Sequence, residues 1–314
     1  MKIIKNIPDH LPEPCVATIG FFDGVHKGHI YLIEQVREIA RQKGLRSAVI
    51  TFPIHPRKVM NADYKPDLLT NYEEKINLLS QTGIDYCFVL DFTKDISKLE
   101  ARDFMRQILK DRFNIDSLLI GHDHRFGYNR SENYEDYYHY GKQLHIDVIQ
   151  AKACVIDNVT VSSSLIRRLL LAGEVQKAEK YLGYLYSLKG LVVGGHKVGR
   201  KLGFPTANIS VDDPEKLIPA DGVYAVNVTI GKTTHDGMLN IGQRPTIDNG
   251  YNTTIEVHIL NYQSDIYNFT ISISFFQRIR NEKKFNNLNE LIQQLLHDKK
   301  TVETAFQKKE IGKS

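Results

Sequence analysis

The chain has 314 residues, 42% hydrophobic and 25% charged, which are ordinary proportions for a soluble globular protein at a length that favours two domains. Its 41 basic and 37 acidic residues give a net charge of +4, too small an excess to indicate nucleic-acid binding, although it suits anionic small substrates. Three widely spaced cysteines, an N-terminus without an apolar signal core and the lack of a membrane-length apolar run argue against a disulfide framework and predict a cytoplasmic protein.

The first half of the chain alternates apolar runs with amphipathic stretches. The apolar runs are residues 16–22, 48–52, 86–90, 118–120 and 146–149. The stretches between them carry apolar residues at helical spacing, such as Ile30, Ile33 and Val36. This order predicts an α/β domain in which helices flank a parallel sheet and ligands bind at the carboxyl ends of the strands.

Residues 20–29 read G-F-F-D-G-V-H-K-G-H and continue directly from the first apolar run. A helix that starts after a strand presents free N–H groups and the positive end of its dipole, so it attracts phosphate. If this helix starts near Val25, His26 and His29 share a face and could donate hydrogen bonds to phosphate oxygens. The alternatives are a tight turn with two helix-capping histidines, or a zinc pair, for which the spacing is atypical.

A run of three hydroxyl residues, Ser162, Ser163 and Ser164, enters another predicted helix. Hydroxyl groups at a helix start accept hydrogen bonds from its free N–H groups and can also bind anions. The run therefore predicts either a second phosphate contact or a plain helix cap.

After about residue 185 the pattern changes. Residues 223–230, 253–260 and 267–276 are rich in β-branched and aromatic residues, and Gly, Asn and Asp turns separate them. A closing amphipathic helix has one apolar face, formed by Leu288, Leu291, Ile292, Leu295 and Leu296. This half is predicted to be a small antiparallel barrel with a C-terminal helix, and the boundary is expected near residues 184 and 185.

Residues 190–208 read G-L-V-V-G-G-H-K-V-G-R-K-L-G-F-P-T-A-N. The segment lacks the Gly-Lys-Ser/Thr of a Walker loop, and its glycines alone indicate no more than a hairpin. In a later strand Ile255, Val257 and Ile259 should point inward, so Glu256 should face the other side. From its position alone, Glu256 is expected to be a solvated surface carboxylate.

Residues 26–29 (H-K-G-H) resemble the H-x-G-H signature of nucleotidylyltransferases, and in particular the adenylyltransferase half of the bacterial bifunctional riboflavin kinase/FMN adenylyltransferase (FAD synthetase) family. The likeness continues in the expected order at residues 51–57, 68–75, 121–127 and 161–167. In the second half, residues 203–208 (G-F-P-T-A-N) resemble the P-T-A-N motif of riboflavin kinases, with further likeness at residues 240–242, 245–246 and 254–258. The resemblance spans nearly the whole chain. It implies a nucleotidylyltransferase-like (Rossmann-like) FMN adenylyltransferase domain at residues 1–184, followed by an antiparallel β-barrel riboflavin kinase domain at residues 185–314.

This resemblance implies a transferase that phosphorylates riboflavin to FMN and adenylylates FMN to FAD, with ATP as co-substrate and Mg²⁺ as cofactor. In the first half, His26 and His29 would stabilise the α-phosphate during attack by the FMN phosphate. The residues implied to bind ATP there are Gly20, Phe21, Asp23, Gly24, Gly28, Ser162, Ser163, Ser164 and Arg167. The residues implied to bind flavin there are Asp123, Phe126, His55 and Arg57.

In the second half, the resemblance implies that Glu256 is the base that accepts the proton of the ribityl 5′-hydroxyl. Thr206 and Asn208 would supply oxygen ligands for magnesium. The residues implied to bind ATP are Gly190, Gly195, Lys197, Gly199, Lys201, Gly203, Pro205, Thr206 and Asn208. The residues implied to bind flavin are Arg280, Glu282 and Phe285, for which the alternative is an exposed helix start with one core phenylalanine.

The sequence departs from the family pattern at Pro53, at His124 in place of an aromatic residue, at Ser164 in place of threonine and at Gly194 in place of histidine. Two alternatives therefore stay open: an enzyme with kinase activity alone, and a flavin- or nucleotide-sensing protein with a degenerate site. A metal hydrolase using His26, His29, His122 and His124 is a third, although no ligating carboxylate recurs at fixed spacing.

Overall fold

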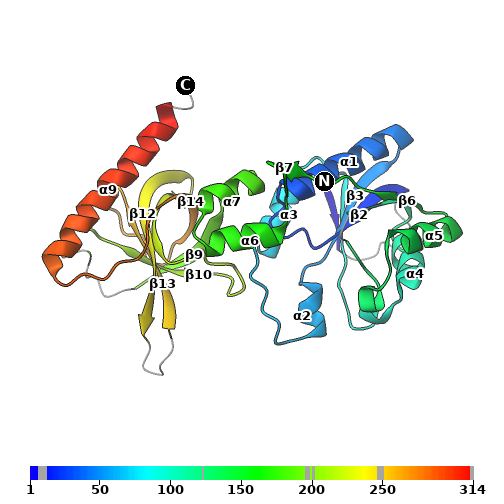
Figure 1. Cartoon of the computed structure of the whole chain (residues 1–314), viewed down its shortest axis with the longest axis horizontal. Coiled ribbons are helices and arrows are strands. Elements are labelled where there is room, and N and C mark those ends of the chain that lie inside the picture. The colour runs from blue at the N-terminus through cyan, green and yellow to red at the C-terminus, as the bar shows by residue number, and fades with distance from the viewer. Residues whose placement is uncertain (6–12, 122–123, 195–198, 200–201, 246–250, 312–314) are drawn as a thin grey trace. The chain divides into compact units, whose positions relative to one another are not determined.

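The computed structural model describes residues 1–5, 13–121, 124–194, 199, 202–245 and 251–311. By packing, the chain divides into two compact units, Met1–Ser163 and Ser164–Ser314. Figure 1 labels the elements of each. Within the described ranges, no helix is both long enough and apolar enough to cross a membrane.

The first unit is built on a six-stranded parallel sheet in the order β1-β4-β3-β2-β5-β6. Its strands are β1 (Lys2–Ile4), β2 (Cys15–Ile19), β3 (Arg46–Thr51), β4 (Tyr86–Val89), β5 (Ile115–Ile120) and β6 (Asp147–Gln150). From β2 the chain runs outward to β3 on one side, and β5 lies on the other side. The strand order therefore reverses at β2, which is the position where parallel α/β sheets bind ligands.

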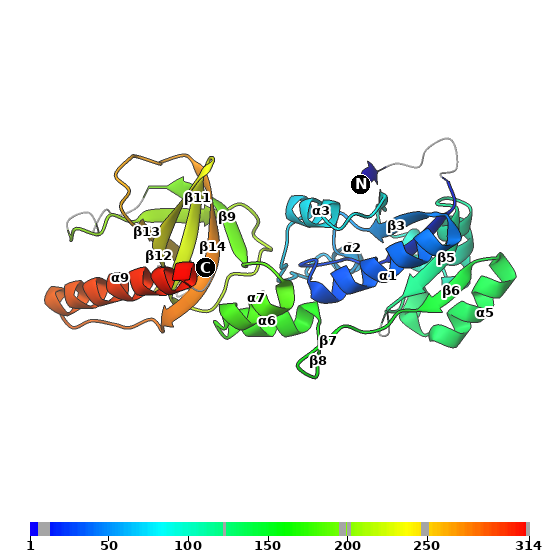
Figure 2. The same cartoon turned by 90° about the horizontal axis from the view of Figure 1, so that it is seen from above.

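Helices cover both faces of this sheet, which is why its strands are almost continuously apolar. One face packs against α1 (Lys27–Lys43) and α3 (Tyr72–Ser80), which Figure 2 shows on the same side of the sheet. The other packs against α4 (Ala101–Phe104), the π-helical turn η2 (Met105–Lys110) and α5 (Tyr134–Leu144). The smaller elements are α2 (Pro56–Met60), η1 (Ile96–Lys98), η3 (Tyr128–Arg130) and the hairpin of β7 (Val155–Ile156) and β8 (Val159–Thr160). The predicted parallel α/β unit is confirmed.

The second unit is a closed antiparallel barrel in the order β10-β13-β12-β11-β14-β9. Its strands are β9 (Ser187–Val193), β10 (Ala207–Val211), β11 (Gly222–Ile230), β12 (Thr233–Pro245), β13 (Tyr251–Ile259) and β14 (Thr270–Arg280). The helix α9 (Leu288–Ile311) follows and packs Val302 and Phe306 against barrel residues that include Val223 and Met238. The predicted barrel with a C-terminal helix is confirmed.

Two short helices, α6 (Ser163–Leu171) and α7 (Val175–Leu182), precede the barrel and pack with it. The Ala220 N–H donates to the Leu170 carbonyl at 3.0 Å, and the Arg278 guanidinium donates to the Ala172 carbonyl at 3.3 Å. These contacts place the division between the packed units at Ser163 and Ser164. The expected boundary between the two functional domains, at residues 184 and 185, differs from this division by packing and stays a prediction.

Candidate active sites

The turn between β2 and α1 forms the first candidate site. Gly24 has a φ of +81°, a conformation that glycine adopts without strain. His26 is the N-cap of α1, and its Nδ1 accepts a hydrogen bond from the His29 N–H at 3.3 Å. The two imidazole rings stack with centroids 3.7 Å apart and planes 16° apart. The predicted pair of histidines therefore does share one face at the start of a helix.

A second set of contacts fixes the shape of this turn. The buried Asp23 carboxylate accepts hydrogen bonds from the backbone N–H groups of Leu69 and Thr70, each at 3.0 Å. The Gly24 N–H donates to the Thr70 hydroxyl at 3.0 Å, and the Ser163 hydroxyl donates to the Asp23 carbonyl at 3.0 Å. Asp23 thus joins three segments that are far apart in the sequence.

Two histidines of this site, His29 and His124, are held in the neutral form. Burial lowers the pKa of His29 well below its ordinary value, and His26, Lys75 and His124 lower it further. Burial, assisted by the Arg130 charge, lowers the pKa of His124 to about 4. His29 Nδ1 and His124 Nε2 are both enclosed and have no hydrogen-bond partner among the described residues. A buried polar atom without a partner is unfavourable for folding, so these two atoms mark the turn as a place where the protein carries a cost.

The residues expected on the flavin side are only partly brought together. His55 caps α2 by accepting from the Arg57 N–H at 3.2 Å, and its ring lies 4.7 Å from the Phe21 ring. Phe126 is 9% exposed and stacks on Tyr137 with centroids 4.3 Å apart, so it belongs to the hydrophobic core. The expected Asp123 lies outside the described residues.

The hydroxyl run starts α6 as expected. Ser162 and Ser163 are partly buried, Ser164 is exposed, and Arg167 follows within the helix, partly buried. The local geometry provides hydroxyl groups and an N-terminal helix turn, which suits an anion.

The second candidate site lies on the barrel around Glu256. The β10–β13 pairing places Asn208 opposite Glu256, and the β12–β13 pairing places Asn240 opposite it on the other side. The Thr206 hydroxyl donates to Glu256 Oε2 at 3.3 Å. Four oxygen-bearing side chains from three strand segments thus gather at one place. All of them except Asn240 are predicted site residues.

The predicted orientation of Glu256 is confirmed. Ile255 and Val257 are 4% and 1% exposed and point into the barrel, whereas Glu256 is partly buried. His258, two residues beyond Glu256, is also buried, because Phe204 and Pro205 cover it: its Nδ1 lies 2.8 Å from the Pro205 carbonyl oxygen.

The glycine-rich segment is described only in part, since Gly195, Lys197 and Lys201 lie outside the described residues. The chain folds back so that Gly199 lies against Phe204, and a Cβ at Gly199 would collide with the Phe204 carbonyl. A Cβ at Gly190 would collide with the Ser210 carbonyl on the adjacent strand. Gly203 has a φ of +80°. Tight packing of the backbone therefore accounts for Gly190 and Gly199.

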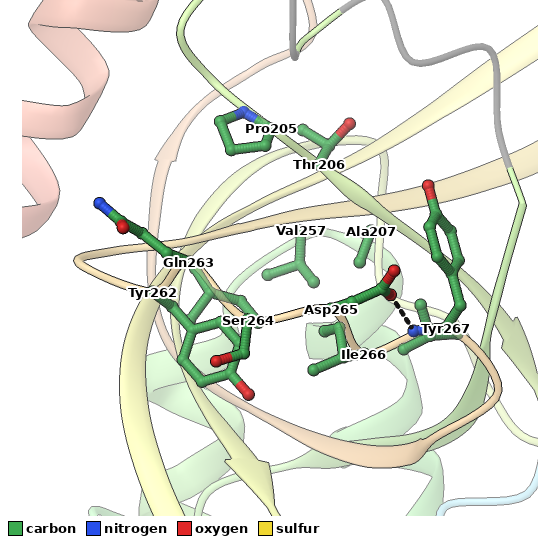
Figure 3. Close-up of a pocket in the computed structure, with 12 residues that line it drawn as sticks. Pro205, Thr206, Ala207, Val257, Tyr262, Gln263, Ser264, Asp265, Ile266 and Tyr267 are labelled. Carbon is green, nitrogen blue, oxygen red and sulfur yellow. Dashed lines mark hydrogen bonds between the residues drawn. The ribbon is translucent and has the colours of Figure 1, made fainter.

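A pocket of about 510 Å³ opens beside Thr206. Figure 3 shows that Pro205, Thr206 and Ala207 line one part of it and the loop of residues 262–267 another. In this loop the Asp265 carboxylate accepts from the Tyr267 N–H at 2.9 Å. This loop is not among the predicted site residues, because nothing in its sequence indicates that it folds back toward Thr206.

The residues expected on the flavin side of the barrel lie at the end of β14 and just after it. Arg280 forms an ion pair with Asp298 of α9, in which Nη2 and Nε lie 2.8 and 2.9 Å from Oδ2, and Asp298 is 1% exposed. The Arg280 guanidinium also lies 5.9 Å from the Phe285 ring centre, and the Glu282 carboxylate lies against Gly242. The alternative of an exposed helix start is wrong, because Arg280 ends a strand and the helix begins at Leu288.

Among the described residues, no three His, Cys, Asp or Glu side chains lie close enough to hold a metal ion. His122, part of the metal-hydrolase alternative, lies outside them.

Comparison with known proteins identifies the kind of enzyme. The family model described as FAD synthetase matches residues 9–165, and the model described as riboflavin kinase matches residues 182–306. The chain is therefore a transferase with two nucleotide-dependent domains, one that makes FAD and one that makes FMN. The match of both models supports two activities rather than one.

Relatives of known function agree over nearly the full length. The bifunctional riboflavin kinase/FMN adenylyltransferase of Listeria monocytogenes is 37% identical over 94% of this chain and 93% of that protein. The Escherichia coli enzyme of the same name is 34% identical over 98% of both chains. A crystal structure described as a macrolide-efflux protein from Streptococcus pneumoniae has a TM-score of 0.86 and 31% identity, over 96% of this chain and 99% of that one.

The chain belongs to the bifunctional riboflavin kinase/FMN adenylyltransferase family. It phosphorylates riboflavin to FMN and adenylylates FMN to FAD, and ATP is the co-substrate of both reactions.

Proposed function

We propose that the first unit transfers the adenylyl group through His26 and His29. An FMN phosphate oxygen attacks the α-phosphorus of ATP, the bond from that phosphorus to the bridging oxygen breaks, and diphosphate leaves with the bonding electrons. The observation that carries the proposal is the stacked pair of imidazoles at the positive end of the 17-residue helix α1. A neutral His29 ring can donate one hydrogen bond to the α-phosphate as negative charge develops there.

The other residues of this site bind and position the substrates. Ser162, Ser163, Ser164 and Arg167 hold the ATP phosphates, and the turn formed by Gly20, Phe21, Gly24 and Gly28 lets them approach the backbone. Asp23 is assigned a positioning role, since its carboxylate already accepts hydrogen bonds from Leu69 and Thr70. Asp123, His55 and Arg57 contact the flavin, and Phe126 supports the wall of that site from within the core.

In the second unit Glu256 is the general base. Its carboxylate accepts the proton of the ribityl 5′-hydroxyl while that oxygen attacks the γ-phosphorus of ATP and ADP leaves. The pocket beside Thr206 holds ATP, with Gly190, Gly195, Lys197, Gly199, Lys201, Gly203, Pro205 and Asn208 as the remaining nucleotide-side residues. Arg280, Glu282 and Phe285 form the flavin side.

Magnesium fits the donor set around Glu256. Thr206 and Asn208 offer a hydroxyl and an amide oxygen beside a carboxylate, and hard oxygen ligands of this kind are those that Mg²⁺ prefers. The ion, when bound, neutralises charge on the ATP phosphates. Thr206 and Asn208 would hold it, which leaves Glu256 available for the substrate proton.

The functional boundary is placed at residues 184 and 185, so that the serine run and Arg167 belong to the adenylyltransferase domain. A cytoplasmic location suits an enzyme that draws on ATP in both steps, and the three free cysteines suit a reducing compartment.

The experiment that tests the proposal is a time course with riboflavin, ATP and Mg²⁺ in which FMN and FAD are separated by chromatography. FMN should appear first and FAD should follow. FMN without FAD would favour a kinase alone, and the lack of both would favour a sensing protein.

A further inference from the structure

Lys75 is a buried cation for which the functions described above give no reason. It lies on α3 with 1% of its surface exposed. Its ammonium donates a hydrogen bond to the Phe52 carbonyl at 2.8 Å and lies 3.8 Å from the centre of the Phe21 ring. The Tyr72 ring is farther away, at 6.0 Å.

The charge of this ammonium is not neutralised by a close carboxylate. Among the described residues, no carboxylate oxygen lies within 4.0 Å of Lys75 Nζ. Asp23 acts on it only from a longer distance, and burial lowers the pKa of Lys75 to about 8. Burying a charge in this way is unfavourable for folding, and a buried cation of this kind next to a cleft is a candidate functional residue.

The contacts of Lys75 lie at the edge of the sheet where the nucleotide is expected. Phe21 follows β2 and Phe52 follows β3, and these strands are neighbours in the sheet. One ammonium therefore links the carboxyl ends of two adjacent strands. It is also close enough to His29 for its charge to lower the pKa of that histidine.

We propose that Lys75 is a positioning residue for adenylyl transfer, which fixes Phe21 and the end of β3 and supplies positive charge for the ATP phosphates at the start of α1. The inference rests on the proposed roles of His26 and His29. A bound triphosphate would add negative charge to that of the more distant Asp23 carboxylate. A purely structural lysine would instead contribute to stability and leave the chemistry of the folded enzyme unchanged.

The test compares Lys75→Met with Lys43→Met in the full-length chain. Methionine retains the unbranched stem and removes the charge. Lys43 is a matched control, because it lies at the other end of α1, pairs with Asp116 and Asp147, and gives the same change in net charge. The measurements are kcat and KM for FAD formation from supplied FMN, the rate of riboflavin phosphorylation, and the midpoint of urea unfolding.

Lys75→Met should lower kcat/KM for ATP in FAD formation by about 10²-fold, the usual effect of losing preorganised charge or positioning. KM for FMN and riboflavin phosphorylation should be unchanged. The unfolding midpoint should be equal or higher, since a buried unpaired charge has been replaced by an apolar group. Lys43→Met should retain FAD formation.

Unchanged FAD formation in Lys75→Met would overturn the inference. The inference would also be overturned if the first unit of the variant unfolds. The same holds if FAD formation falls only in proportion to the amount of folded protein. If the unsubstituted enzyme itself made no FAD, the adenylyl-transfer function would fail first, so the two failures are distinguishable.

Discussion

At the scale of single residues, the neighbours of a side chain decide what it can do. Glu256 is one carboxylate among 37 acidic residues in the chain, and its own strand explains only the face on which it lies. Its neighbours Thr206, Asn208 and Asn240 come from other strand segments. They place hydroxyl and amide groups beside the carboxylate, as the proposed role of Glu256 as a general base requires.

Glu256→Gln should therefore abolish most kinase activity while the fold is retained. The amide keeps the size and can still accept from Thr206, but it cannot take a proton, so FMN formation should fall by roughly 10²–10⁴-fold. The measurement is the rate of FMN formation from riboflavin. Glu303→Gln, an exposed change on α9, is the control, and near-normal rates in Glu256→Gln would make Glu256 a surface carboxylate.

His124 offers a prediction about pH. Its pKa is about 4 in the folded protein, against an ordinary value of 6.5. Between pH 4 and pH 6.5 the unfolded chain therefore binds a proton at His124 more readily than the folded protein does. The free energy of unfolding should then fall as the pH falls from 6.5 toward 4. His124→Gln should flatten this part of the profile in urea titrations, whereas His139→Gln, at an exposed position, should not. Equal slopes in all three proteins would contradict the buried, neutral state of His124.

At the scale of elements, the spacing of apolar residues along the sequence predicted the strands and their inward faces, which depend on neighbouring residues in the chain. Alternation predicted the inward face of β13 at Ile255 and Val257, and apolar runs predicted the central strands of the sheet. Contacts between distant segments could not be predicted in this way. The helical position of Lys75 gives no sign that its ammonium reaches Phe52, and a pocket wall at residues 262–267 depends on how the barrel closes.

The junction of β14 and α9 depends on one such distant contact. Asp298, almost fully buried, accepts both hydrogen bonds of the Arg280 ion pair and another from Gln294 at 2.8 Å. Asp298→Ala leaves the Arg280 charge partly buried without its partner, so the free energy of unfolding should fall by about 3 kcal/mol. Urea unfolding of the full chain measures this. A change no larger than that of Glu303→Ala on the same helix would show that the ion pair is not required.

At the scale of the whole molecule, the chain combines two compact units that each have their own hydrophobic core. The proposed catalytic groups of the first unit, His26 and His29, lie at the start of α1, whereas Glu256 of the second unit lies on β13. Both units use ATP, yet each transfers a different part of it. A substitution that inactivates one site should therefore leave the other site active.

His29→Ala tests this expectation most directly, when the folded variant is supplied with riboflavin, ATP and Mg²⁺ and its FMN and FAD are measured over time. Loss of one donor to the α-phosphate should lower the rate of FAD formation on the order of 10²–10³-fold, with little change in ATP affinity. FMN should then accumulate at the rate of the unsubstituted enzyme. An unchanged rate of FAD formation would contradict the role of residues 20–29, and loss of both products would contradict two independent sites.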